Sequence, residues 1–185
     1  MPRIAYAALV IAALPAGAWA ADTTQVSPAD KAAAMMVAYQ DACLGAFPNA
    51  ATLDQLMAAE KAEKLDDAAA RAALLGHQGV AWTVTGAKAK YVVALEAPPA
   101  ARCVVTGQAA EGEGVRTLFT VVVTSFVKGR DIGPLQTPPV QQGNIGGRPA
   151  TLQIIGASGQ AFVNMGVANE DGSTQLRLTR EFAPR

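Results

Sequence analysis

The chain has 185 residues, with 15 Lys and Arg against 15 Asp and Glu, one His and two Cys. The basic residues are scattered singly and aromatic residues make up only 5% of the chain, which argues against a nucleic-acid partner or a polybasic membrane patch. One His and two Cys also leave few ligands for a transition metal. We therefore expect neither a metal site nor a cofactor.

Residues 1–21 have the pattern of a secretory signal peptide. Arg3 precedes an apolar run, and a small-x-small motif that ends at Ala20 follows the run. The run is about half the roughly 20 residues that a membrane-crossing helix needs, so it indicates export and no membrane span. We expect cleavage near Ala20 or Ala21, a single mature domain over residues 22–185, and a location in the periplasm or outside the cell.

The first predicted helix begins at Ser27-Pro28. Ser is a favoured N-cap, and Pro is tolerated in the first turn because its missing N–H would have no helical partner there. Apolar residues then recur at steps of three and four up to a stop at Phe47-Pro48, which predicts one buried face. This face contains Ala32, Met35, Met36, Tyr39, Cys43 and Ala46.

Two shorter helices are expected next. Thr52 and Gln55 have the spacing of a capping box, which predicts a second helix that runs into the charged stretch at residues 60–64. The acid pair at residues 66–67 begins a third helix, and Gly76 is placed to end it in a left-handed conformation.

From Val80 the apolar period changes to two, which is typical of strands. Three segments show this period: residues 80–84, 91–95 and 103–105. They predict a three-stranded antiparallel meander, with Trp82 as a core residue rather than a ligand platform.

Residues 115–127 are ambiguous, because their Val-rich centre favours a strand whereas apolar residues recur at i, i+3, i+4 and i+7. The spacing predicts a helix packed on a sheet. Three further strands are expected over residues 151–155, 161–168 and 174–180. The predicted fold class is α+β: N-terminal helices, a three-stranded meander, a central helix and a second three-stranded meander.

Cys43 and Cys103 are predicted to form a disulfide. An even number of Cys in an exported protein usually indicates a bridge. The alternatives are a metal pair and a catalytic thiol, but neither a CxxC motif nor a neighbouring His supports them. A bridge that closes a loop of about 60 residues would stabilise the fold by about 4 kcal/mol.

Residues 129–149 form a Gly- and Pro-rich stretch without periodicity. Loops of this length inside a domain usually either have a function or lack order, and apolar residues here could form a contact surface. These residues are Leu135, Pro138, Pro139, Val140 and Ile145. The alternative is a surface loop without a role.

His77 is the only His, so any His-based catalysis must use it. It follows a predicted helix end, where a cationic side chain interacts favourably with the helix dipole, and this structural role is the alternative to a catalytic one. Ser158 fails as a hydrolase nucleophile, because Gly159 follows it directly whereas the strained elbow has Gly two residues after the Ser.

Three landmarks stand in the first half of the chain: Cys43 followed by Phe47-Pro48, a Gly-x-x-Trp-x-Val motif at residues 79–84, and Cys103-Val104-Val105. Together they resemble a group of small, uncharacterised exported proteins of proteobacteria, over about residues 30–107. The resemblance implies a location in the cell envelope and a bridged α+β domain. It implies no active-site residues.

No catalytic motif is complete, so the leading hypothesis is a periplasmic binding or protein-interaction module. Its partner would be an unknown envelope protein or a small ligand, and the stretch at residues 129–149 with the adjoining strands would be the contact surface. One alternative is a small envelope hydrolase that uses His77 with a carboxylate. Another is a purely structural envelope protein.

Overall fold

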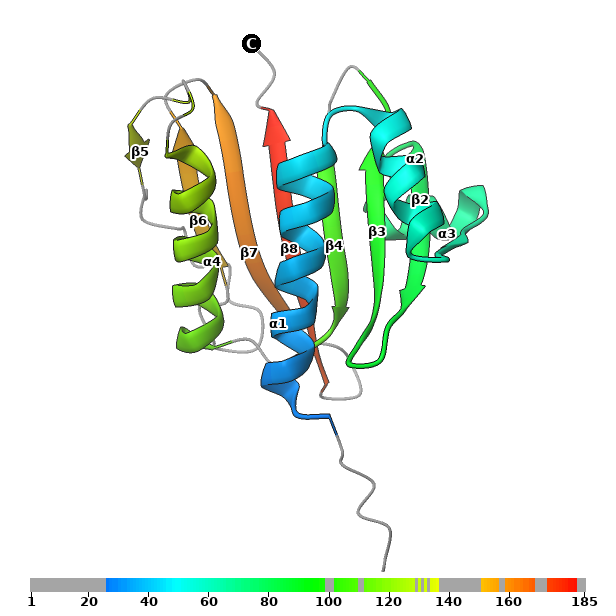
Figure 1. Ribbon diagram of the computed structural model, residues 1–185, viewed down its shortest axis with the longest axis horizontal. Helices are drawn as coiled ribbons and strands as arrows, with labels where there is room; N and C mark the ends of the chain where they lie inside the picture. Colours follow the sequence, from blue (N-terminus) through cyan, green and yellow to red (C-terminus); the bar gives the residue numbers. More distant parts are fainter. Residues whose placement is uncertain are drawn as a thin grey trace, which may run out of the picture.

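The computed structural model folds the chain into one eight-stranded antiparallel sheet with helices on both faces (Figure 1). It describes residues 26–98, 102–109, 112–128, 130, 132, 134–136, 151–156, 159–168 and 173–182. The elements in chain order are α1 (Pro28–Tyr39), the π-helix η1 (Gln40–Ala46), α2 (Ala50–Ala59), β1 (Glu63–Lys64), α3 (Asp67–Ala73), β2 (Gly79–Thr85), β3 (Lys90–Glu96), β4 (Arg102–Gln108), α4 (Glu113–Val127), β5 (Leu135–Gln136), β6 (Thr151–Gly156), β7 (Gln160–Ala168) and β8 (Thr174–Phe182).

The strands follow the order β1-β2-β3-β4-β8-β7-β6-β5 across the sheet, and all neighbours are antiparallel. A helix followed by three strands occurs twice along the chain. The first unit is α1 with β2–β4, and the second is α4 with β6–β8. In the first unit, η1, α2, β1 and α3 lie between α1 and β2. The last strands of the two units, β4 and β8, pair at the centre of the sheet.

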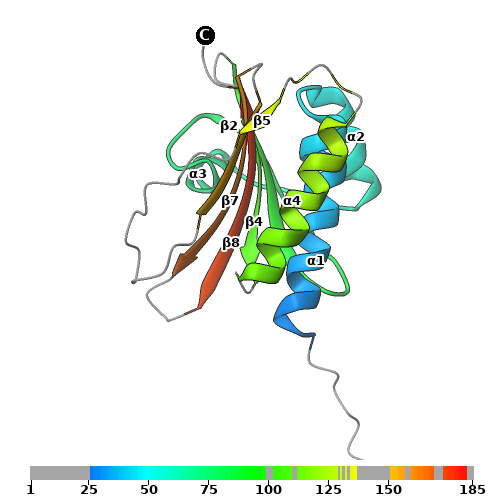
Figure 2. The same ribbon diagram turned by 90° about the vertical axis from the view of Figure 1, so that its left-hand side faces the viewer.

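The helices form two layers. α1, α2 and α4 cover one face of the sheet and α3 lies on the other, as the side view shows (Figure 2). None of the described helices is long and apolar enough to span a membrane. The main core lies beneath α1, η1, α2 and α4, and its fully buried side chains include Tyr39, Leu53, Phe119, Phe162, Leu176 and Leu178. A smaller core beneath α3 consists of Ala70, Leu74, Ala81, Ala94 and Val104.

The predicted first helix is confirmed in its start and in its buried face. The Ser27 hydroxyl accepts a hydrogen bond from the Asp30 backbone N–H at 3.1 Å. All the apolar residues that were expected on the core face are buried. The helix widens to π-helical geometry from Gln40 to Ala46, which the residue spacing did not indicate.

The predicted disulfide is also confirmed. Cys43 of η1 is bonded to Cys103 of β4, and their Cα atoms lie 5.3 Å apart. The bridge therefore fastens the end of the first helical segment to a central strand.

The predicted start of the second helix at Thr52 is wrong. Asn49 is the N-cap, and its side-chain oxygen accepts a hydrogen bond from the Thr52 backbone N–H at 3.1 Å. The helix also ends at Ala59 rather than running on through the charged stretch. Lys61 takes a left-handed backbone conformation, with φ of 53°, and Glu63–Lys64 then pairs with β2 as strand β1.

The third helix begins as predicted, with the Asp66 side chain accepting a hydrogen bond from the Ala69 backbone N–H at 2.8 Å. It ends through two left-handed residues, Leu75 and Gly76, whose φ values are 55° and 94°. This turn brings the chain back to the sheet and positions His77, whose backbone N–H donates to the Leu74 carbonyl.

The mixed helix and antiparallel sheet class is confirmed, but the layout of two three-stranded meanders is wrong. β4 and β8 pair from Arg102 with Glu181 to Gln108 with Gln175, and this ladder joins the strands into one sheet. The two-residue strands β1 and β5 extend the sheet at its edges. β5 comes from the stretch at residues 129–149 that was predicted to have no regular structure.

Candidate functional site

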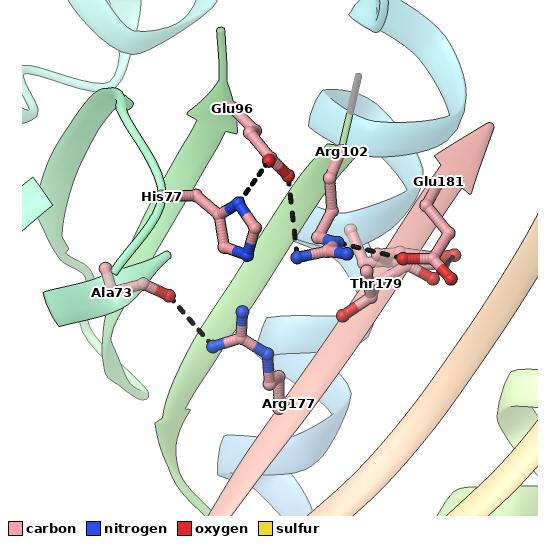
Figure 3. Close-up of polar contacts among 8 residues, drawn as sticks. Ala73, His77, Glu96, Arg102, Arg177, Thr179 and Glu181 are labelled. Carbon is pink, nitrogen blue, oxygen red and sulfur yellow. Dashed lines mark hydrogen bonds and ion pairs between the residues drawn. The ribbon is translucent and has the colours of Figure 1, made fainter. Parts of the chain in front are cut away.

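His77 lies in a cluster of charged side chains at one end of the sheet, on the face that α3 covers (Figure 3). Its Nδ1 atom is 2.8 Å from Oε1 of Glu96, the last residue of β3. The Glu96 side chain is only 4% exposed, whereas that of His77 is 52% exposed. A buried carboxylate thus fixes an imidazole that is half-exposed to solvent.

Arg102 continues this cluster across the sheet. Its Nη1 is 3.5 Å from Glu96 Oε2, and its Nε donates a hydrogen bond to Glu181 Oε2 at 2.8 Å. Arg102 and Glu181 are direct cross-strand partners in β4 and β8. Negative, positive and negative side chains therefore alternate across β3, β4 and β8, which balances the charge of the buried Glu96.

Arg177 of β8 lies beside this cluster and has no carboxylate partner among the described residues. Its Nη1 donates to the carbonyl of Ala73, the last residue of α3, at 2.8 Å, while Nη2 is buried without a partner. Burial lowers the pKa of Arg177 from its usual value, and the nearby Arg102 charge lowers it further. In Figure 3 its guanidinium points toward the His77 ring.

The His77 and Glu96 pair has the geometry of a general base with an orienting carboxylate. With Nδ1–H donating to Glu96, the Nε2 atom of a neutral imidazole is free to accept a proton. A hydrolase would also need a nucleophile, but no hydroxyl or thiol in the described part of the chain is hydrogen-bonded to His77. Both cysteines are in the disulfide.

A cleft of about 620 Å³ lies on the opposite face of the molecule, between η1 and α4. Both apolar and polar side chains line it. The lining residues are Gln40, Asp41, Leu44, Gly45, Leu56, Val121, Val122, Ser125, Phe126 and Arg130. We call this space the cleft.

Two arginines meet at the Phe126 end of the cleft. The Arg130 guanidinium lies 4.1 Å from the centroid of the Phe126 ring, and the Arg180 guanidinium lies 4.7 Å from it. Arg130 also donates a hydrogen bond to the Phe126 carbonyl near the end of α4. Within the described residues neither arginine forms an ion pair.

Arg180 is buried and anchors η1 to the sheet. Its Nη1 donates to the carbonyls of Cys43, Leu44 and Phe47 at 3.0 to 3.4 Å, and its Nη2 donates to Gln160 Oε1 at 2.8 Å. Burial lowers the pKa of Arg180 to about 10, so the guanidinium stays charged at neutral pH. The cation thus satisfies the carbonyls that a helix end leaves without partners.

Two exposed apolar side chains continue from the cleft along α4, which lies beside α1 (Figure 1). Val121 lines the cleft and is 56% exposed, and Leu118, one turn earlier on α4, is 38% exposed. We call Leu118 and Val121 the apolar strip. A second hollow of about 360 Å³ lies at its far end, lined by Ala29, Ala32, Ala33, Gly112, Gly114, Val115 and Leu118.

The residues proposed from the sequence as a contact surface fall in different places. Leu135 lies in β5, half-buried and packed against the main core. Pro138, Pro139, Val140 and Ile145 lie outside the described residues. The same stretch does contribute Arg130 to the cleft, and Trp82 is buried in the main core as predicted.

Four residues of these sites were not expected from the sequence: Glu96, Arg102, Arg177 and Arg180. One signal was available for Arg180, because Leu176, Leu178 and Arg180 share one face of a strand with period two. A cation that continues an apolar alternation indicates a buried charge. No comparable signal marks the other residues, since their contacts join different strands and α3.

Comparisons with protein-family models, curated proteins and solved structures find no match to this chain. In the part of the chain that the structure describes, no group of His, Cys, Asp and Glu is arranged to hold a metal ion.

Proposed function

We propose that the protein is a binding module of the periplasm or the extracellular space, and that its contact surface is the cleft together with the apolar strip. The signal-peptide pattern supports the location, and the Cys43–Cys103 bridge is compatible with an oxidising compartment. The volume of the cleft, about 620 Å³, falls within the range of small-molecule sites.

The observation that carries this proposal is the distribution of exposed apolar side chains. Of the four large hydrophobic residues exposed in the described structure, Leu118 and Val121 form the apolar strip beside the cleft, and Val37 belongs to the neighbouring helix α1. Exposed apolar side chains with polar residues around them are typical of ligand-binding grooves. The fourth, Leu75, belongs to the turn after α3.

A neutral fluorescent probe, N-phenyl-1-naphthylamine, tests the proposal. The native protein should bind the probe and increase its emission, and Ser125→Trp should abolish binding because an indole placed at this exposed position fills the cleft. Thr124→Trp is the matched control, since Thr124 is also exposed on α4 but does not line the cleft. Failure of the native protein to bind the probe, or equal binding by both variants, would contradict the proposal.

A second candidate is the envelope hydrolase, and the 2.8 Å contact between His77 Nδ1 and Glu96 is the observation that favours it. General-base catalysis contributes about 100-fold or more to a rate. His77→Gln should therefore reduce hydrolysis of p-nitrophenyl acetate about 100-fold, and Glu96→Gln should reduce it less. If the unmodified protein hydrolyses this ester no faster than His77→Gln, the hydrolase hypothesis is wrong.

A further inference from the structure

We propose that the cleft binds a small anionic amphiphile, with the anionic group beside Arg130 and the apolar chain against Leu44, Leu56 and Phe126. This inference rests on the proposed function, because it assumes that the cleft is a binding surface. It adds the chemical class of the ligand and the direction in which it lies.

The apolar part of the site comes from three separate segments. Leu44 belongs to η1, Leu56 to α2, and Val122 and Phe126 to α4. Contacts with these side chains remove hydrocarbon from water without selecting a particular head group. The hollow at the far end of the apolar strip is also lined by apolar or small residues, so an alkyl chain that leaves the cleft along the strip stays on apolar surface.

The charge at the Phe126 end selects an anion. Arg130 and Arg180 both lie within 5 Å of the Phe126 ring centroid, and their mutual repulsion contributes to the lowered pKa of Arg180. Each cation also contacts the carbonyls of a helix end, that of η1 for Arg180 and that of α4 for Arg130. A helix C-terminus is equivalent to about half a negative charge, so about one positive charge of the two remains uncompensated.

Asp41 limits where the anion can lie. It lines the cleft from the η1 wall. Burial raises the pKa of Tyr91 on β3, and the charges of Glu60 and Asp41 raise it further. No ion pair joins Asp41 to Arg130 in the described structure. An anionic head is therefore repelled by the η1 wall and attracted to Arg130, which gives the bound amphiphile a single direction.

Isothermal titration calorimetry with decanoate and decyltrimethylammonium tests the inference on the disulfide-intact protein. The two probes share one alkyl chain and differ in the sign of the head charge. Decanoate should bind about ten-fold or more tightly than the cation, and Arg130→Gln should remove this preference. Lys128→Gln is the matched control, because Lys128 is an exposed cation at the end of α4 that does not line the cleft. Asp41→Asn should strengthen decanoate binding.

The outcomes separate this inference from the proposed function. If the neutral probe binds but the two decyl probes bind equally, the inference is wrong and the binding module stands. The same conclusion follows if Lys128→Gln weakens decanoate binding as much as Arg130→Gln does. If none of the three probes binds, both proposals are wrong. A dimer by sedimentation that Ser125→Trp disrupts would make a second copy of the chain the occupant of the cleft and would overturn the inference.

Discussion

Replacing Arg180 by Met should destabilise the fold by about 3 kcal/mol. The guanidinium makes two short hydrogen bonds, at 3.0 Å to the Cys43 carbonyl and at 2.8 Å to Gln160 Oε1. A hydrogen bond from a charged donor contributes about 1.5 kcal/mol net, which gives about 3 kcal/mol for the pair. The longer contacts to Leu44 and Phe47 are not counted in this figure.

Urea unfolding with the disulfide intact measures the effect, and a lower midpoint with an unchanged slope would identify a loss of stability. Arg180→Lys should cause an intermediate loss, because one ammonium group cannot reach both Gln160 and the carbonyls of η1. Arg71→Met serves as control, since Arg71 is exposed on α3. If the free energy of unfolding of Arg180→Met lies within about 0.5 kcal/mol of that of the native protein, then water replaces the guanidinium and Arg180 does not anchor η1.

Three further predictions concern the core. Mass spectrometry of the non-reduced protein should show no free thiol, and replacing Cys43 and Cys103 by Ala should cost about 4 kcal/mol in urea unfolding. Burial raises the pKa of Tyr39 above its usual value, so the stability that the neutral phenol supplies is present below pH about 10. This stability is lost as pH rises beyond that value, by about 1.4 kcal/mol per pH unit. Tyr39→Phe should flatten the alkaline decline in the free energy of unfolding, and an equal decline in both proteins would contradict this role of Tyr39. Gly79→Ala should destabilise the fold by about 2 kcal/mol, because the new Cβ collides with the β3 backbone. Gly86→Ala is the control: its Cβ would make only an ordinary contact at 3.5 Å, so its urea midpoint should stay near that of the native protein.

Local features of the fold could be predicted from the sequence because short-range physics determines them. The Ser27 cap follows from its residue type and the buried face of α1 from residue spacing, and the period of two indicates the positions of β2 and β3. The helix at Glu113–Val127 was predicted correctly, although its Val residues favour a strand, because the spacing of its apolar residues has the period of a helix.

The rest depends on contacts between distant residues. The pairing of β4 with β8 joins segments far apart in the sequence, and no local pattern encodes it. Strands β1 and β5 have two residues each, which is too short to show alternation. The N-cap at Asn49 was missed because Thr52, three residues later, offers a similar signal.

The candidate site was harder to predict than the fold. The cleft is assembled from η1, α2, α4 and Arg130, so its lining residues share no motif. His77 was identified as the only His, but its partner Glu96 lies across a turn and a strand. The alternation of Leu176, Leu178 and Arg180 is the one pattern that could have indicated a buried cation before the structure was known.

The central position of β8 has a consequence for how the chain reaches its native state. The strand that fills the middle of the sheet is the last one to be synthesised. Until β8 is available, β4 and β7 are both edge strands. Their unpaired backbone N–H and C=O groups can then pair with a strand of a neighbouring chain. Truncation before Thr174 should therefore produce an aggregating product rather than a smaller stable domain.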